Sequence, residues 1–142
     1  DVTPPTVLSA TVSSDGKSVT LNFNEPLDST VLSSALPWQF KLTAGLATYF
    51  PTTVAFSQGV LTLGLPDTPI PANSQLNPPT VSVHYDDPSV NNDSANVLQD
   101  ASGNDVATFD ITATNNSTYV PVAPPMLASS FSPFLIAFWS VL

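Results

Sequence analysis

The sequence predicts an all-β protein, an antiparallel β-sandwich of about seven strands with an extended C-terminal arm. Hydrophobic and polar residues alternate with a period of two in about seven short segments. Turn-forming residues separate these segments, and no long segment has the period of a helix. Sheets with one hydrophobic face bury those faces against each other, so the pattern predicts two packed sheets.

The first predicted hairpin joins residues 6–13 to residues 18–24. In its second strand Val19, Leu21 and Phe23 alternate with polar residues, which predicts one buried face. The connection contains Asp15-Gly16, and such a pair is a strong hairpin signal because tight turns require positive φ angles.

Five further segments show the same alternation, and the predicted strands cover residues 38–43, 53–56, 61–65, 81–85 and 109–114. In the first of these, Trp38 and Phe40 occupy alternate positions, so we expect Trp38 to lie in the core. The alternative for Trp38 is an exposed ring that stacks on a sugar.

The connections between strands differ in character. Residues 30–36 suit one or two helical turns, capped by Asp28 or Ser29 and ended by Pro37. Residues 66–79 form a Pro-rich extended loop, and residues 86–105 form a long polar loop. A stiff Pro-rich linker follows the last strand, so we predict a sandwich over residues 1–117 and a linker with a hydrophobic arm over residues 118–142.

The charge balance excludes several kinds of partner. Lys17 and Lys41 are the only basic residues, and the net charge is −9. Nucleic-acid binding requires a basic surface, so we expect no nucleic-acid partner. The chain has no cysteine, so it forms no disulfide and has no thiolate nucleophile. Residues 134–142 are too few for a transmembrane helix, which needs about 20 residues, so we expect no transmembrane segment.

Two stretches carry a family resemblance. One contains Asp1-Val-Thr-Pro-Pro-Thr-Val-Leu and Leu21-Asn-Phe-Asn-Glu-Pro-Leu-Asp28, and the other is Leu98-Gln-Asp-Ala-Ser-Gly-Asn-Asp-Val-Ala-Thr-Phe109. They resemble the opening and closing motifs of the SwmB-like group of Ig-like domains, named after a cyanobacterial cell-surface protein. The resemblance implies an Ig-like sandwich and an extracellular or cell-surface location. Domains of that group occur as tandem repeats in large secreted adhesins, whereas this chain has one copy followed by a Pro-rich linker.

A calcium site is one candidate for the polar loop. Calcium prefers oxygen ligands at short spacing, which Asp86, Asp87, Asp100 and Asp105 supply together with neighbouring Asn residues. The alternative is a set of turns in which Asp and Asn bond their own backbone. With calcium, the chain would be an adhesin module that binds a glycan or a cell surface through residues 66–79 and 86–105. No other cofactor is predicted.

The residues for catalysis are few, and we predict that the chain is not an enzyme. His84 is the only histidine, and the Gly-x-Ser-x-Gly motif of serine hydrolases is absent from the sequence. A surface or cross-strand histidine is therefore the favoured interpretation. Glu25 and Asp28 could form a glycosidase pair, but they belong to the opening motif, where a structural role is favoured.

The hydrophobic arm is the strongest functional signal. Residues 134–142 contain three aromatic side chains and no charged one, and exposure to water would be unfavourable. The arm either forms a final strand of its own sandwich or docks onto a neighbouring subunit, and the Pro-rich linker favours the second. We therefore predict a non-catalytic structural protein of a cell-surface layer, a filament or a virion surface. Its predicted partner-binding residues are Phe131, Phe134, Leu135, Ile136, Phe138, Trp139, Val141 and Leu142.

Overall fold

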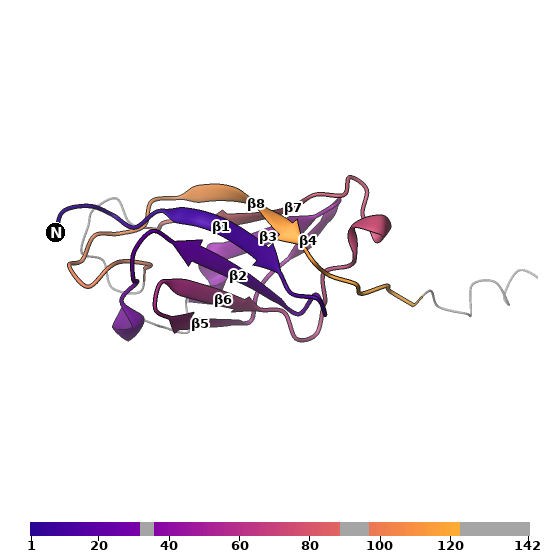
Figure 1. The fold of residues 1–142 in the computed structure, drawn as a ribbon, viewed down its shortest axis with the longest axis horizontal. Helices are drawn as coiled ribbons and strands as arrows, with labels where there is room; N and C mark the ends of the chain where they lie inside the picture. Colours follow the sequence, from indigo (N-terminus) through magenta and orange to yellow (C-terminus); the bar gives the residue numbers. More distant parts are fainter. Residues whose placement is uncertain (32–35, 89–96, 123–142) are drawn as a thin grey trace, which may run out of the picture.

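The structure, a computed structural model, describes residues 1–31, 36–88 and 97–122. In these ranges the chain forms eight β-strands and three short 3₁₀ helices (Figure 1). The strands are β1 (Val7–Val12), β2 (Ser18–Phe23), β3 (Phe40–Ala44), β4 (Ala47–Tyr49), β5 (Thr53–Ser57), β6 (Val60–Gly64), β7 (Val81–Tyr85) and β8 (Phe109–Asn115). The helices are η1 (Ser29–Val31), η2 (Leu36–Gln39) and η3 (Asn73–Gln75). The all-β prediction is confirmed.

The strands follow the order β4-β3-β7-β8-β1-β2-β6-β5 in one curled sheet, which folds over into two layers (Figure 1). Residues 109–113 of β8 pair with β7, and its last two residues pair with β1. Thus β8 belongs to both layers and joins them. The pairing of β1 with β8 is parallel and all other pairs are antiparallel, so the prediction of a purely antiparallel sandwich needs this one correction.

All seven predicted strands are present, and β4 is an additional one. It contains only Ala47, Thr48 and Tyr49, which is too short for the alternation of hydrophobic and polar residues to reveal. β4 and β5 are the two edges of the curled sheet, and they are consecutive in the chain. Residues 50–52 connect them directly.

The core lies between the two layers and takes side chains from both. Alternate residues of β2, β3, β6 and β7 are buried, as the period-two pattern predicts. A row of aromatic rings fills one end: the ring centres of Phe40 and Tyr85 are 5.1 Å apart, and those of Tyr85 and Phe109 are 5.5 Å apart. Phe23 meets Phe109 edge-on at 6.2 Å, which links the layers.

The prediction that Trp38 lies in the core is wrong. Its side chain is 84% exposed, whereas Leu36 and Phe40 on either side are fully buried. Trp38 lies in η2, so the period-two pattern of the strand begins only at Phe40. The sequence predicted that Pro37 ends a helical turn, but Pro37 lies inside η2. A proline is tolerated there because it falls in the first turn of a helix.

A helical turn does form at η1, where the Asp28 carboxylate accepts the Thr30 backbone N–H at 2.9 Å. This is the capping contact that the sequence predicts for Asp28. Residues 32–35 of the predicted helical segment lie outside the described residues.

Residues 117–119, which follow β8, are hydrogen-bonded to the loops of the sandwich. The Ser117 hydroxyl donates to the Ile70 carbonyl oxygen at 2.6 Å, and the Thr118 N–H donates to the Ser14 carbonyl oxygen at 2.9 Å. The Ala72 N–H donates to the Tyr119 carbonyl oxygen at 2.8 Å. Beyond Tyr119 the chain points away from the sandwich, and Val122 is 89% exposed (Figure 1).

Candidate functional site

The eight residues predicted to bind a partner all lie outside the described residues: Phe131, Phe134, Leu135, Ile136, Phe138, Trp139, Val141 and Leu142. The described part still bears on one alternative, in which the arm forms the last strand of its own sandwich. The last strand of the described chain, β8, is already hydrogen-bonded on both sides, to β7 and to β1. A further strand could pair only at β4 or β5, the two edges of the sheet.

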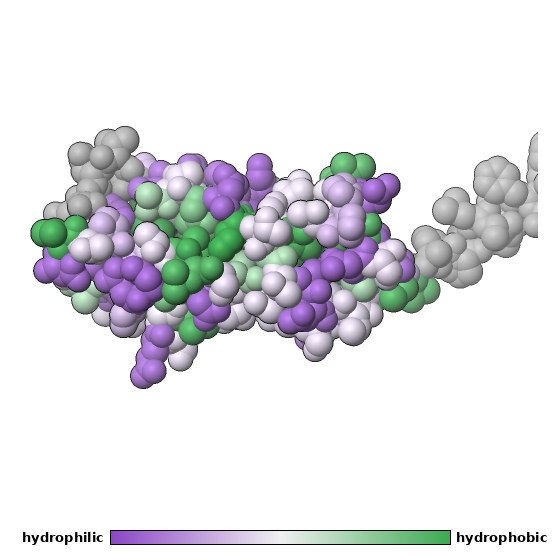
Figure 2. Space-filling view, turned by 45° about the horizontal axis from the view of Figure 1, so that its top comes forward, coloured by the Kyte–Doolittle hydropathy of each residue, from purple (hydrophilic) through white to green (hydrophobic). Residues whose placement is uncertain are grey.

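Several large hydrophobic side chains of the described part are exposed, and Figure 2 shows hydrophobic surface between polar side chains on the face it presents. Two of these residues line one pocket: Trp38, 84% exposed, and Phe50, 57% exposed. The pocket has a volume of about 240 Å³, and its lining residues are Pro37, Trp38, Phe50, Pro51 and Thr52. We call it the aromatic groove.

Two elements build the aromatic groove. Burial of Leu36 and Phe40 fixes η2 against the sandwich, and the helical turn between them directs Trp38 outward. The link between β4 and β5 contributes Phe50 and Pro51. The groove was not predicted from the sequence. Pro37 was a usable signal, because a proline next to an apparent strand argues against regular strand pairing there.

The lining of the groove limits what it can bind. Two aromatic rings and two prolines make its wall largely apolar, and none of the five lining residues is charged. A cavity of about 150 Å³ is sufficient for one benzene ring, so this volume suits a single aromatic side chain. The groove is therefore suited to an uncharged, hydrophobic group.

Asp100, one of the four predicted calcium ligands, is buried and heavily hydrogen-bonded. Its Oδ1 accepts the N–H groups of Ser102 at 2.8 Å and Asn104 at 2.9 Å, and its Oδ2 accepts the Asn104 amide at 2.8 Å. Burial alone would raise the pKa of Asp100, but these hydrogen bonds outweigh it and lower the pKa below its ordinary value. The carboxylate therefore stabilises its own turn, as the backbone-bonding alternative predicts.

Carboxylate oxygens of Asp1, Glu25 and Asp100 lie within 4.8 Å of one another. The predicted ligands Asp86, Asp87 and Asp105 are not part of this group. Such a group can form without a metal, because Asp1 and Glu25 are not buried and remain in contact with water. Calcium binding by the polar loop stays a prediction, and residues 89–96 of that loop lie outside the described part.

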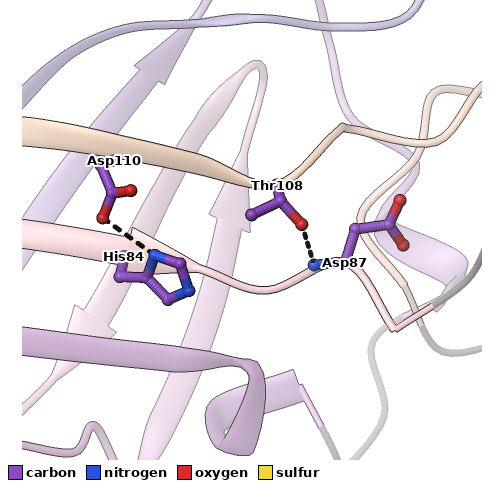
Figure 3. Close-up of polar contacts among 4 residues, drawn as sticks. All are labelled: His84, Asp87, Thr108 and Asp110. Atoms are coloured by element: carbon purple, nitrogen blue, oxygen red, sulfur yellow. Dashed lines mark hydrogen bonds and ion pairs between the residues drawn. The ribbon is translucent and has the colours of Figure 1, made fainter.

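His84 and Asp110 face each other across β7 and β8, where their residues pair in register (Figure 3). His84 Nδ1 lies 2.9 Å from Asp110 Oδ1, and the Asp110 side chain is 76% exposed. Just beyond the end of β7 and before the start of β8, the Asp87 N–H donates to the Thr108 hydroxyl oxygen at 2.9 Å (Figure 3). This is a cross-strand surface pair of low energy, which agrees with the structural interpretation of His84.

Comparisons with known proteins find similarity in structure alone. No sequence profile of a known protein family matches the chain, and no curated protein matches it. The fold resembles part of the bacterial S-layer protein SbsC, with a TM-score of 0.55 and 22% identity. The match to its N-terminal part covers 79% of this chain and 24% of that one. The match to SbsC domains 1–6 covers 86% of this chain and 14% of that one, as does the match to rSbsC(31-844).

The structure is that of a β-sandwich domain with an exposed aromatic groove, and its fold is similar to part of a surface-layer protein. The chain spans about a quarter or less of the SbsC chains that it resembles. The resemblance to the SwmB-like group stays a prediction. In the described part of the chain, no helix has the length and hydrophobicity needed to cross a membrane.

Proposed function

We propose that this chain is a non-catalytic structural domain of a cell-surface assembly, which it joins through the hydrophobic segment at residues 131–142. The fold supports this proposal, because the solved structures that it resembles belong to a surface-layer protein. That likeness favours a layer on a cell over a virion surface, the other location that the sequence suggested.

One observation carries the proposal: the described residues by themselves form a continuous hydrophobic core between the two layers. The hydrophobic core cluster runs from Ala10 to Ala113, and β8 has partners on both sides. Yet residues 131–142 include four aromatic side chains, each worth about 5 kcal/mol gross if buried. This supports a neighbouring subunit as the surface that covers them.

The test is the solution mass of the full chain, measured by light scattering over a concentration series and by electron microscopy. We expect oligomers, filaments or layers whose mass rises with concentration. The variant Phe138→Ser/Trp139→Ser should remain monomeric because it lacks the two strongest anchors. Val122→Ser, which removes an exposed hydrophobic side chain from the linker, is the matched control and should assemble normally.

Two outcomes contradict the proposal. A wild-type chain that stays monomeric at every concentration has no assembly function under these conditions. A Phe138→Ser/Trp139→Ser variant that assembles like the wild type shows that the segment is not the docking element.

The exposure of Trp38 favours a second candidate, in which the aromatic groove binds a glycan. An exposed tryptophan offers a flat apolar face on which a sugar ring can stack. Titration with a panel of oligosaccharides would then change the tryptophan fluorescence of the wild type and not that of Trp38→Ala. If no oligosaccharide changes it, this candidate fails.

A further inference from the structure

We propose that the aromatic groove of one copy receives an aromatic side chain from residues 131–142 of a second copy, so that copies join head to tail. This inference rests on the proposed function and adds the docking site and the partner. The anchor is Phe138 or Trp139, because these are the adjacent bulky aromatics of the segment.

The groove and the segment match in chemistry. The groove is lined by Trp38, Phe50 and two prolines, and its volume of about 240 Å³ holds one aromatic side chain. Residues 131–142 contain no charged side chain. Two copies with a net charge of −9 each repel one another, so an uncharged contact is the kind that they can share.

The strand directions place the groove and the exit of the chain at opposite ends of the sheet. β3 and β8 are both antiparallel to β7, so they run in the same direction. Trp38 lies just before β3 begins, whereas the chain leaves the sandwich after β8 ends (Figure 1). To reach its own groove, the chain would have to reverse its direction and run back alongside β3.

A second copy in the same orientation removes the need for this reversal. Its β3 begins at the end that faces the exit of the first copy, and its groove lies there. The nine residues that follow Val122, up to Phe131, span at most about 30 Å, so the segment can extend into the next copy. Pro121, Pro124 and Pro125 favour such an extended path.

The position of the groove gives the contact a further consequence. Phe50 and Pro51 lie in the link between β4 and β5, the two edges of the sheet. A segment that docks there lies beside two edge strands, whose outer backbone groups have no partner strand within the described residues. A head-to-tail contact uses different surfaces on the two copies, so it leaves one free groove and one free segment and can repeat without limit.

The experiment uses three full-length variants. The groove variant is Trp38→Ser/Phe50→Ser, and the segment variant is Phe138→Ser/Trp139→Ser. Leu46→Ser is the matched control, because Leu46 is 89% exposed, lies in the turn after β3 and does not line the groove. Sedimentation velocity measures the mass of each variant, and circular dichroism with thermal melting checks that each is folded.

We expect the groove and segment variants to be monomeric alone and the control to assemble like the wild type. Loss of the anchor or of its groove should weaken association at least tenfold. An equimolar mixture of the groove variant and the segment variant should form a dimer of twice 14.9 kDa that does not grow further. In this dimer the intact segment of one chain occupies the intact groove of the other.

Three outcomes would overturn the inference. If the groove variant assembles normally and the segment variant does not, the segment docks elsewhere, and the proposed function survives without this site. If the segment variant also assembles, the proposed function itself fails. If both variants are monomeric and their mixture stays monomeric, the groove and the segment do not meet in two different copies.

Discussion

The backbone N–H of Leu98 donates a buried hydrogen bond to the hydroxyl oxygen of Tyr85, over 3.1 Å. Tyr85 ends β7, and its ring lies between those of Phe40 and Phe109. Burial raises the pKa of Tyr85 above its ordinary value, so the hydroxyl keeps its proton at neutral pH. The bond fixes the loop residue Leu98 to the end of the core that the three aromatic rings fill.

Replacement of Tyr85 by phenylalanine should destabilise the protein by about 1–3 kcal/mol. The ring remains, but the buried N–H of Leu98 loses its acceptor. Urea unfolding followed by fluorescence measures the change. Tyr119→Phe, at a more exposed tyrosine, is the control and should change stability by less than about 0.5 kcal/mol. Equal effects at both positions would mean that the bond to Leu98 contributes nothing.

Phe40→Ala and Trp38→Ala should differ sharply in their effect on stability, although the two residues occupy alternate positions of the same hydrophobic pattern in the sequence. Phe40 is fully buried, so its truncation should cost about 3–5 kcal/mol. Trp38 is 84% exposed, so its truncation should change the stability of the monomer by less than about 0.5 kcal/mol. Thermal melting at a concentration where the chain is monomeric distinguishes them. A large loss from Trp38→Ala would show that Trp38 is buried after all.

Gly16→Ala should destabilise the first hairpin. Gly16 has a φ of +71°, and a Cβ at this position would overlap the backbone oxygen of Ile70. Gly103 has a similar φ of +82° but open space around it, so Gly103→Ala isolates the cost of the backbone conformation, about 1 kcal/mol. We expect Gly16→Ala to cost clearly more in chemical unfolding. Equal costs would mean that the hairpin can shift away from Ile70.

Acid should destabilise the turn at Asp100. Hydrogen bonds hold the pKa of Asp100 below the ordinary value of 3.8 in the folded state. A group with a lowered folded pKa contributes stability above its unfolded pKa, and this contribution is lost as the pH falls through the folded pKa. The melting temperature of the wild type should therefore fall below about pH 4 more steeply than that of Asp100→Asn. Parallel pH profiles would contradict this role for Asp100.

Salt should promote the proposed assembly. Each copy has a net charge of −9, and added salt screens the repulsion between copies, over about 10 Å at 0.1 M. The contact itself is uncharged, so screening does not weaken it. Light scattering at rising sodium chloride concentration should show a growing mass. A falling mass would indicate that ion pairs hold the copies together.

Seven of the eight strands could be predicted from the sequence, because each of these seven has a local pattern of hydrophobic and polar residues. In β2, Val19, Leu21 and Phe23 are buried, as their spacing indicates. The same rule failed at Trp38, because a 3₁₀ turn that contains Pro37 precedes the strand and ends the alternation. β4 has only three residues and leaves no recognisable pattern.

The acidic residues show a different limit. The sequence suggests a group within residues 86–105, because those carboxylates are close along the chain. In the structure Asp100 instead approaches Asp1 and Glu25, from the other motif. The backbone bond from Asp28 to Gln99, at 2.8 Å, brings the two motifs side by side.

Local patterns of hydrophobicity were thus enough to identify the all-β class, the buried face of most strands and an uncharged hydrophobic segment at residues 134–142. They were not enough to show that β8 is paired on both sides, or that the link between the edge strands carries Phe50 to the pocket beside Trp38. The alternation of residues records which side chains are buried. The pairing of strands depends on contacts between residues that are distant in the sequence, and these leave no local trace.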